Sequence, residues 1–90
     1  MRIPRKLKIG GHIYKIKVLK KWENMDEGDF GETDYEQGII YINKSLTEGE
    51  RGAAFFHEIF HVLNKTLNHT LLDSLSEQLF QVFKDNKLLK

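Results

Sequence analysis

The sequence predicts an α+β fold in which a small, mostly antiparallel sheet of three to four strands packs on two helices. Three observations support this fold class. The N-terminal part alternates apolar and charged residues, a short β-branched segment follows at 38–44, and apolar residues recur with helical spacing from about residue 47 onward. With 90 residues, 40% hydrophobic and 30% charged, the chain is expected to form one small globular domain over 1–90.

Residues 6–20 are predicted to form a β-hairpin. In KLKI (6–9) and YKIKV (14–18), apolar residues alternate with lysines, which makes one face of each strand apolar and the other charged. Between these segments, Gly10 and Gly11 supply the positive φ angles that a tight two-residue turn requires.

A polar segment with two glycines follows over 23–37 and is predicted to begin as a loop. From about Gly31 it is expected to become a strand that leads to a turn at Gln37-Gly38. Residues 38–44 (GIIYINK) are then strongly indicated as a strand, because the segment is short, β-branched and aromatic.

The first helix is predicted over about 47–66. Its start carries the spacing of a capping box, which is present both in Thr47-x-x-Glu50 and in Ser45-x-x-Glu48.

The second helix is predicted over about 70–86, after a turn at 68–70. Thr70 and Asp73 have the spacing of an N-terminal cap. The apolar side chains of this helix form one stripe, which consists of Leu72, Leu75, Leu79, Val82 and Phe83.

Charge is distributed unevenly, although the net charge is only +1. Residues 1–21 contain eight Lys or Arg and no acid, whereas residues 22–50 contain nine acids and one lysine. A basic segment of this kind can attract nucleic acid. Because no RNA-binding signature or recognition-helix pattern accompanies the lysines, we interpret it as a solvated strand face beside a complementary acidic loop and do not expect nucleic acid as a partner.

Cysteine is absent, which excludes disulfide scaffolds and thiolate zinc fingers. Any metal site must therefore use histidines and carboxylates. No apolar run has the length of a signal peptide or a membrane span. We therefore expect a cytoplasmic protein that does not associate with membranes.

The segment AAFFHEIFHVLN (53–64) places two histidines four residues apart on the first predicted helix, with a glutamate directly after the first. His57 and His61 project from the same side of such a helix, so their imidazoles can converge on one tetrahedral zinc ion. Glu58 lies about 100° around the helix, near enough to take a proton from a water on that ion. A random arrangement of this composition would contain roughly 0.015 copies of the pattern, which favours a metal site over an exposed helix face.

A catalytic zinc site requires a third protein ligand. Three downstream residues are candidates: His69 in the predicted turn, and Asp73 and Glu77 one turn apart on the second helix. An antiparallel helix pair would bring these carboxylates beside His57 and His61. Glu77 is the preferred candidate, and Asp73 is either its rival or a partner that orients a histidine.

The succession of hairpin, GIIYIN strand, HEIFH helix and glutamate-bearing second helix resembles the minimal zincin core over about Gly31 to Asn86. The chain is similar to short HExxH proteins encoded by phages and prophage-like elements, and more distantly to ImmA/IrrE-type metallopeptidases. The resemblance implies that a strand just before the motif helix, residues 39–43 here, holds a peptide substrate by edge pairing.

For the site, the resemblance implies that His57, His61 and Glu77 bind zinc and that Glu58 is the catalytic base. The chain departs from the larger peptidases because it has no second lobe, no downstream Met-turn and no histidine at the metzincin spacing. The group that stabilises the oxyanion is therefore unassigned, and the candidate donors are Tyr35, Tyr41 and His69.

The expected function is a zinc-dependent metallopeptidase that hydrolyses a peptide bond in a protein partner. Two alternatives stand beside it. One is a non-catalytic metal-binding or interaction module of phage or mobile-element origin. The other is a nucleic-acid-binding domain that uses the basic N-terminal hairpin.

Overall fold

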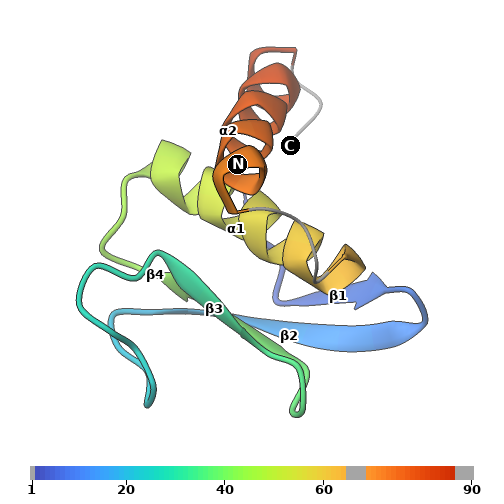
Figure 1. Ribbon diagram of the computed structural model, residues 1–90, viewed down its shortest axis with the longest axis vertical. Helices are drawn as coiled ribbons and strands as arrows, with labels where there is room; N and C mark the ends of the chain where they lie inside the picture. The colour runs from blue at the N-terminus through green and yellow to red at the C-terminus, as the bar shows by residue number, and fades with distance from the viewer. Residues whose placement is uncertain (1, 65–68, 87–90) are drawn as a thin grey trace.

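The computed structural model describes residues 2–64 and 69–86 (Figure 1). The predicted α+β class, the hairpin, the strand within 38–44 and the presence of both helices are confirmed. The first helix ends at Leu63, before the predicted residue 66, and His69 and Thr70 belong to the second helix and not to the predicted turn. The rest of that turn lies outside the described residues. In chain order the elements are β1 (Lys6–Ile9), β2 (His12–Leu19), β3 (Gly31–Asp34), β4 (Ile39–Asn43), α1 (Glu48–Leu63) and α2 (His69–Asp85).

The four strands form one mixed sheet with the order β1-β2-β4-β3. The β1/β2 and β3/β4 pairs are antiparallel, as expected, whereas β2 and β4 run parallel. This parallel pair was not predicted. It also corrects the expectation that residues 39–43 offer an edge to substrate, because β4 lies inside the sheet and is paired on both sides. The edge strand next to β4 is β3.

Both hairpins turn on glycines with positive φ. Gly10 and Gly11 have φ angles of 59° and 95°, as the predicted two-residue turn requires, and Gly38 between β3 and β4 has a φ of 69°. At the start of α1, the Thr47 side chain accepts from the Glu50 amide and the Glu50 side chain accepts from the Thr47 amide. Of the two possible capping boxes, the structure therefore uses the second.

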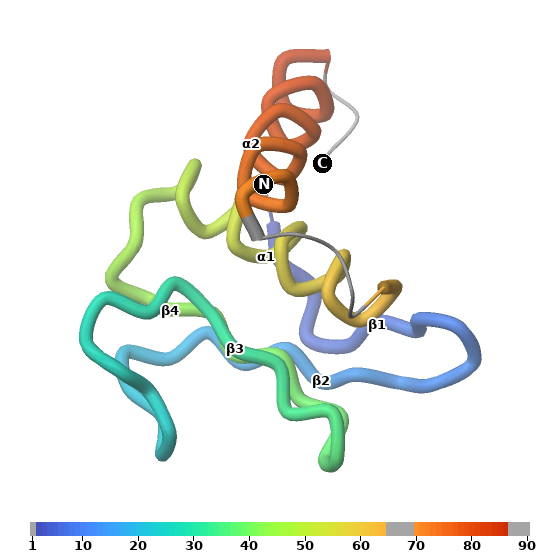
Figure 2. The backbone as a smooth tube through the Cα atoms, in the orientation of Figure 1, coloured from blue at the N-terminus to red at the C-terminus, as the bar shows by residue number. Residues whose placement is uncertain are grey.

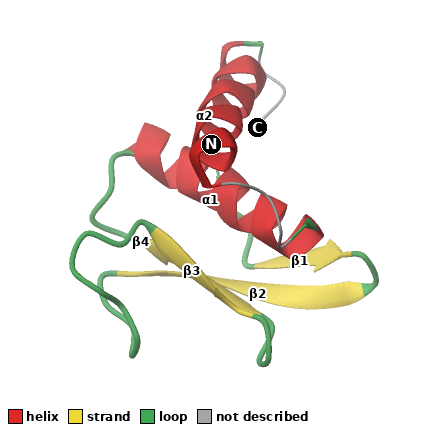
Figure 3. Cartoon of the chain, in the orientation of Figure 1, coloured by secondary structure: helices red, strands yellow, loops and turns green. Residues whose placement is uncertain are grey.

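The hydrophobic core lies between the sheet and α1. Ile40 and Ile42 of β4 are fully buried and form one cluster with Ile16 of β2 and with Ala54 and Phe55 of α1. Because side chains alternate along a strand, the lysines of the hairpin lie on the opposite face. Both helices lie on the same side of the sheet, so no described helix covers this second face (Figure 3).

α2 packs on the side of α1 that is turned away from the sheet (Figures 1 and 2). Leu72, Ser76 and Phe80 are buried and follow one another at intervals of four residues, so they mark the face that contacts α1. The predicted apolar stripe is therefore only partly correct, since Leu75 and Val82 are 42% and 43% exposed. Neither α1 nor the described part of α2 is long and apolar enough to cross a membrane.

The two helices are in close contact where Gly52 of α1 faces Phe80 of α2. A Cβ atom at Gly52 would overlap the buried Phe80 ring. At Gly49, one turn earlier, a Cβ atom would lie 3.9 Å from the same ring, which is an ordinary contact. Gly52 thus sets the separation of the helices and, with it, the distance between α2 and the histidines of α1.

Candidate metal centre

α1 brings the two histidines of the motif together. The Nε2 atoms of His57 and His61 are 2.9 Å apart, and their ring centroids are 4.6 Å apart. Two nitrogens bound to one tetrahedral zinc at about 2.0–2.1 Å would be separated by roughly 3.3 Å. A small rotation of either ring would bring both nitrogens to that separation, so the pair fits a metal ion.

Glu58 lies between α1 and β3 and is only 6% exposed. The Thr33 hydroxyl donates to its Oε1 at 2.9 Å, while its Oε2 lies 4.0 Å from Nε2 of His57. The carboxylate is thus fixed by the strand beside it and lies next to the nitrogen that faces the other histidine. A polar side chain so well buried requires such a partner.

The environment of Glu58 favours its protonated form in the metal-free protein. Burial raises the pKa of the Glu58 carboxyl to about 7, with smaller contributions from the negative charges of Glu32 and Asp29, while the Thr33 hydrogen bond acts in the opposite direction. A carboxyl with a pKa near neutrality is suited to exchange protons at physiological pH.

Gly31 makes room for this arrangement. A Cβ atom there would lie 2.8 Å from the Tyr41 carbonyl oxygen and 3.3 Å from Cγ of Glu58. Any side chain at this position would therefore move β3 away from β4 or from the carboxylate. Gly31 and Thr33 were not predicted as site residues, because nothing in their local sequence marks them. Their role depends on the pairing that places β3 beside α1.

Asp73, in the second turn of α2, contacts the outer side of the histidine pair. Its Oδ1 lies 2.7 Å from Nδ1 of His57, the ring nitrogen that does not face His61. A carboxylate in this position fixes the tautomer and orientation of an imidazole, and it raises the basicity of the opposite nitrogen. Of the two roles left open for Asp73, metal ligand or partner that orients a histidine, this geometry matches the partner.

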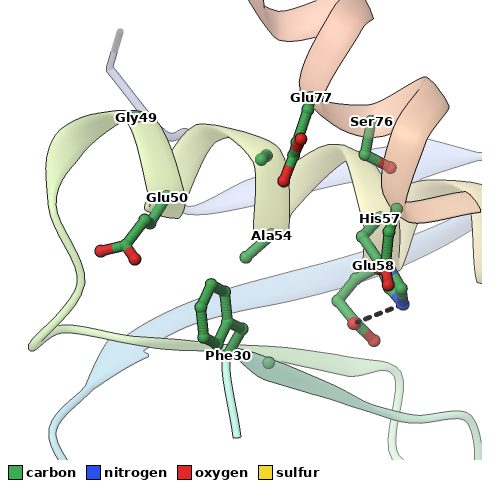
Figure 4. A pocket seen from close by; sticks show the side chains of 11 residues that line it. Phe30, Gly49, Glu50, Ala54, His57, Glu58, Ser76 and Glu77 are labelled. Carbon is green, nitrogen blue, oxygen red and sulfur yellow. Dashed lines mark ion pairs between the residues drawn. The ribbon is translucent and has the colours of Figure 1, made fainter.

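Glu77 lies one turn beyond Asp73 and lines the same pocket, which has a volume of about 610 Å³. In Figure 4 its side chain points from α2 toward Ala54 of α1, between Glu50 on one side and His57 and Glu58 on the other. Among the described residues, the groups close enough to share one ion are His57, Glu58 and His61. Glu77 as third ligand remains a prediction, and the side chain of His69, the remaining candidate, is outside the described part of the chain.

Two tyrosines were candidates for stabilising an oxyanion. Tyr41 points to the opposite face of the sheet, where Trp22 stacks on it at 5.3 Å between ring centroids, so it does not reach the pocket. Tyr35 follows β3 and is 39% exposed. Partial burial and the nearby charge of Glu58 raise the pKa of its hydroxyl, which places Tyr35 within electrostatic reach of the site.

The family comparison agrees with this geometry. The model of the IrrE N-terminal-like domain, a peptidase family, matches residues 13–87, which include the histidine pair, Glu58, Asp73 and Glu77. No curated protein and no solved structure matches the chain. The cluster of His57, Glu58 and His61 is suited to hold a metal ion. On the match over most of its length, the chain belongs to the IrrE N-terminal-like domain family of metallopeptidases.

Proposed function

We propose that the protein is a zinc-dependent peptidase that hydrolyses a peptide bond in a protein partner. The observation that carries this proposal is the convergence of two histidine Nε2 atoms, 2.9 Å apart, beside a buried carboxylate 4.0 Å from one of them. When bound there, zinc would supply a Lewis acid that polarises the peptide carbonyl and acidifies a water molecule.

Glu58 is the proton carrier of the reaction. Its carboxylate removes a proton from the attacking water as the water oxygen forms a bond to the peptide carbonyl carbon. It then delivers that proton to the amide nitrogen, and the carbon–nitrogen bond breaks. Thr33 holds the carboxylate during both transfers through its 2.9 Å hydrogen bond.

The ligand set is His57, His61 and Glu77, with Asp73 as the residue that orients His57. The 2.7 Å contact between Asp73 and Nδ1 of His57 supports this division, because it occupies Nδ1 and turns Nε2 toward His61. Glu77 lines the pocket and carries a largely exposed side chain that is free to rotate toward the histidines. The alternative is that Asp73 itself completes the site.

The substrate is proposed to pair with β3. This strand is bonded to β4 on one side only, and Gly31 at its start lines the pocket. An extended peptide can add to such an edge through main-chain hydrogen bonds. One of its side chains would then enter the pocket between the Phe30 ring and Ala54, where small and apolar groups leave space.

The first experiment is the metal content of the purified protein, measured by mass spectrometry together with hydrolysis of an unstructured peptide library. We expect about one zinc per chain, in keeping with a single set of ligands. Glu58→Gln should keep the metal and lose about 10²–10⁴-fold in hydrolysis rate. Metal retention with unchanged biological activity in Glu58→Gln would instead indicate a non-catalytic binding module.

The ligand assignment is tested with two conservative substitutions on α2. Glu77→Gln should release the metal, whereas Asp73→Asn should weaken its binding by about 10–100-fold, as is typical for a partner of a metal-bound histidine. Complete metal loss in Asp73→Asn, with normal binding in Glu77→Gln, would exchange the two roles. Absence of metal in the wild-type protein, even after addition of zinc, would refute the proposed function.

A further inference from the structure

The face of the sheet opposite the helices carries a group of lysines that the peptidase site does not use. The register places Lys6 of β1 directly opposite Lys15 of β2. Lys8, opposite Ile13, continues the same face at one end of this pair, and Lys17 continues it at the other end, so the four side chains form one diagonal row. All four are exposed. We call Lys6, Lys8, Lys15 and Lys17 the lysine face.

The lysine face is an unfavourable arrangement for the isolated protein. Like charges directly opposite each other on neighbouring strands destabilise a sheet. On its other side β2 pairs with the parallel strand β4. There Ile39 and Tyr41 lie opposite Lys15 and Lys17 and carry no negative charge. Within residues 2–64 and 69–86 no ion pair involves these four lysines. Glu32 and Asp34 of β3 lie on the same face of the sheet, but β4 separates them from the lysines of β2.

A hollow of about 510 Å³ adjoins the lysine face. Its charged lining residues are Arg5, Lys6, Lys15 and Lys17, and its apolar ones are Ile3, Pro4, Ile16 and Val18. A fifth cation thus borders the same surface. Concave surfaces lined by one sign of charge concentrate the field and attract counter-ions.

We propose that the lysine face and the adjoining hollow bind the sugar-phosphate backbone of nucleic acid, without reading its sequence. Lysine is a compact point charge that contacts phosphate without the fixed fork of arginine. Neighbouring lysines are about 5–7 Å apart along and across the strands, which suits a polyanion with regularly repeated charges. The proposal does not depend on the peptidase activity.

The other side chains of this face argue against a protein partner. Its exposed large apolar residues are Ile13 and Leu19, which are six residues apart on β2 and therefore separated by about 20 Å. A protein interface needs a contiguous apolar or aromatic centre. Tyr41 does not provide one, because Trp22 covers its ring.

The same absence of an exposed ring excludes base stacking as the mode of binding. Proteins that hold single strands without sequence preference generally stack bases on aromatic side chains. The exposed tyrosine and phenylalanine nearest the sheet, Tyr35 and Phe30, belong to the pocket side. Charge alone then carries the affinity, and duplex and single strand are distinguished only by charge density.

The test is fluorescence anisotropy with a labelled 20-base-pair DNA duplex and the corresponding single strand. If four phosphates are neutralised, log K should fall against log salt with a slope of about −3.6 for the duplex, a loss of roughly 150-fold between 50 and 200 mM salt. Lys15→Gln/Lys17→Gln should halve this slope. The charge-matched control Lys44→Gln/Lys84→Gln, at exposed positions outside the lysine face, should leave it unchanged.

Two further arms make the outcome decisive. Glu58→Gln and the addition of a chelator should not change binding, because the pocket lies on the other side of the sheet. Equal losses in the lysine-face variant and in the control would overturn the proposal, as would stronger binding to poly-glutamate or to anionic phosphatidylglycerol vesicles than to the duplex at equal charge concentration. Thermal melting of both variants verifies that they are folded.

Discussion

The two faces of the sheet differ in the burial and the partners of their charged side chains. On the face covered by α1, Glu58 is almost fully buried and accepts a hydrogen bond from Thr33. On the open face, Lys15 lies directly opposite Lys6 with no acidic partner among the described residues. Away from water a charge is costly and must be matched by the fold itself. In water it costs little, so a repeated pattern there points to something outside the fold.

The largest effect should appear at the buried carboxyl. In the metal-free protein with chelator, Glu58 has a pKa of about 7 in the folded state and an ordinary carboxyl pKa near 4.3 in the unfolded state. Between these values the folded state holds a proton that the unfolded state has released. The free energy of unfolding should therefore decrease as pH rises from about 4.5 to about 7, by on the order of 3 kcal/mol.

Glu58→Gln isolates this contribution, because every other side chain is the same in both proteins. Urea unfolding at several pH values should give a wild-type stability that falls relative to the variant across this range. Parallel curves would show that burial does not hold the proton on Glu58. No residue of the open face should produce a comparable difference.

The next effect tests the packing on the covered side. Gly52→Ala would place a methyl group into the Phe80 ring, which should destabilise the protein by about 1–3 kcal/mol. This loss exceeds the gain of up to about 1 kcal/mol that alanine brings to a helix. Gly49→Ala is the matched control on α1, since its methyl group would make only an ordinary contact with the Phe80 ring and should not destabilise. Equal urea midpoints for both variants would contradict the close crossing.

The smallest effect belongs to the open face, and it has the opposite sign. Lys15→Gln removes the repulsion from Lys6 and should raise the free energy of unfolding by about 0.2–1 kcal/mol at low salt. The gain should disappear at high salt, where surface charges are screened. Lys44→Gln serves as the comparison, and a loss of stability in Lys15→Gln would mean that the lysine contributes to packing.

The sequence predicted those features that depend on neighbours along the chain. Alternation and the Gly10-Gly11 pair located the hairpin, the capping box located the start of α1, and the four-residue spacing brought His57 and His61 together. Each of these follows from the geometry of a single element. Their positions in the structure agree with the predicted ranges to within a few residues.

What the sequence did not reveal depends on contacts between distant segments. The parallel pairing of β2 with β4 places β3 at the edge, and no local pattern encodes it. Thr33 joins the site only through that arrangement. On α2, the apolar residues cover more of the helix than α1 can bury, so periodicity could not decide that Phe80 would be buried and Leu75 exposed. Because the rotation of α2 about its own axis could not be predicted, the sequence could not decide between Asp73 and Glu77 as the third metal ligand.

The hydrogen bond from Thr33 to Glu58 has a consequence for kinetics. It connects the proposed proton carrier to the strand whose outer edge is proposed to receive the peptide. A substrate that pairs with the whole edge of β3 would restrict the motion of the Glu58 carboxylate. A substrate that does not extend to Thr33 would leave the carboxylate more mobile. A longer substrate peptide should therefore raise kcat and not only lower KM, because binding energy from residues far from the cleaved bond can stabilise the transition state. Pairing with the edge strand β3 would thus make the rate of hydrolysis depend on the length of the substrate.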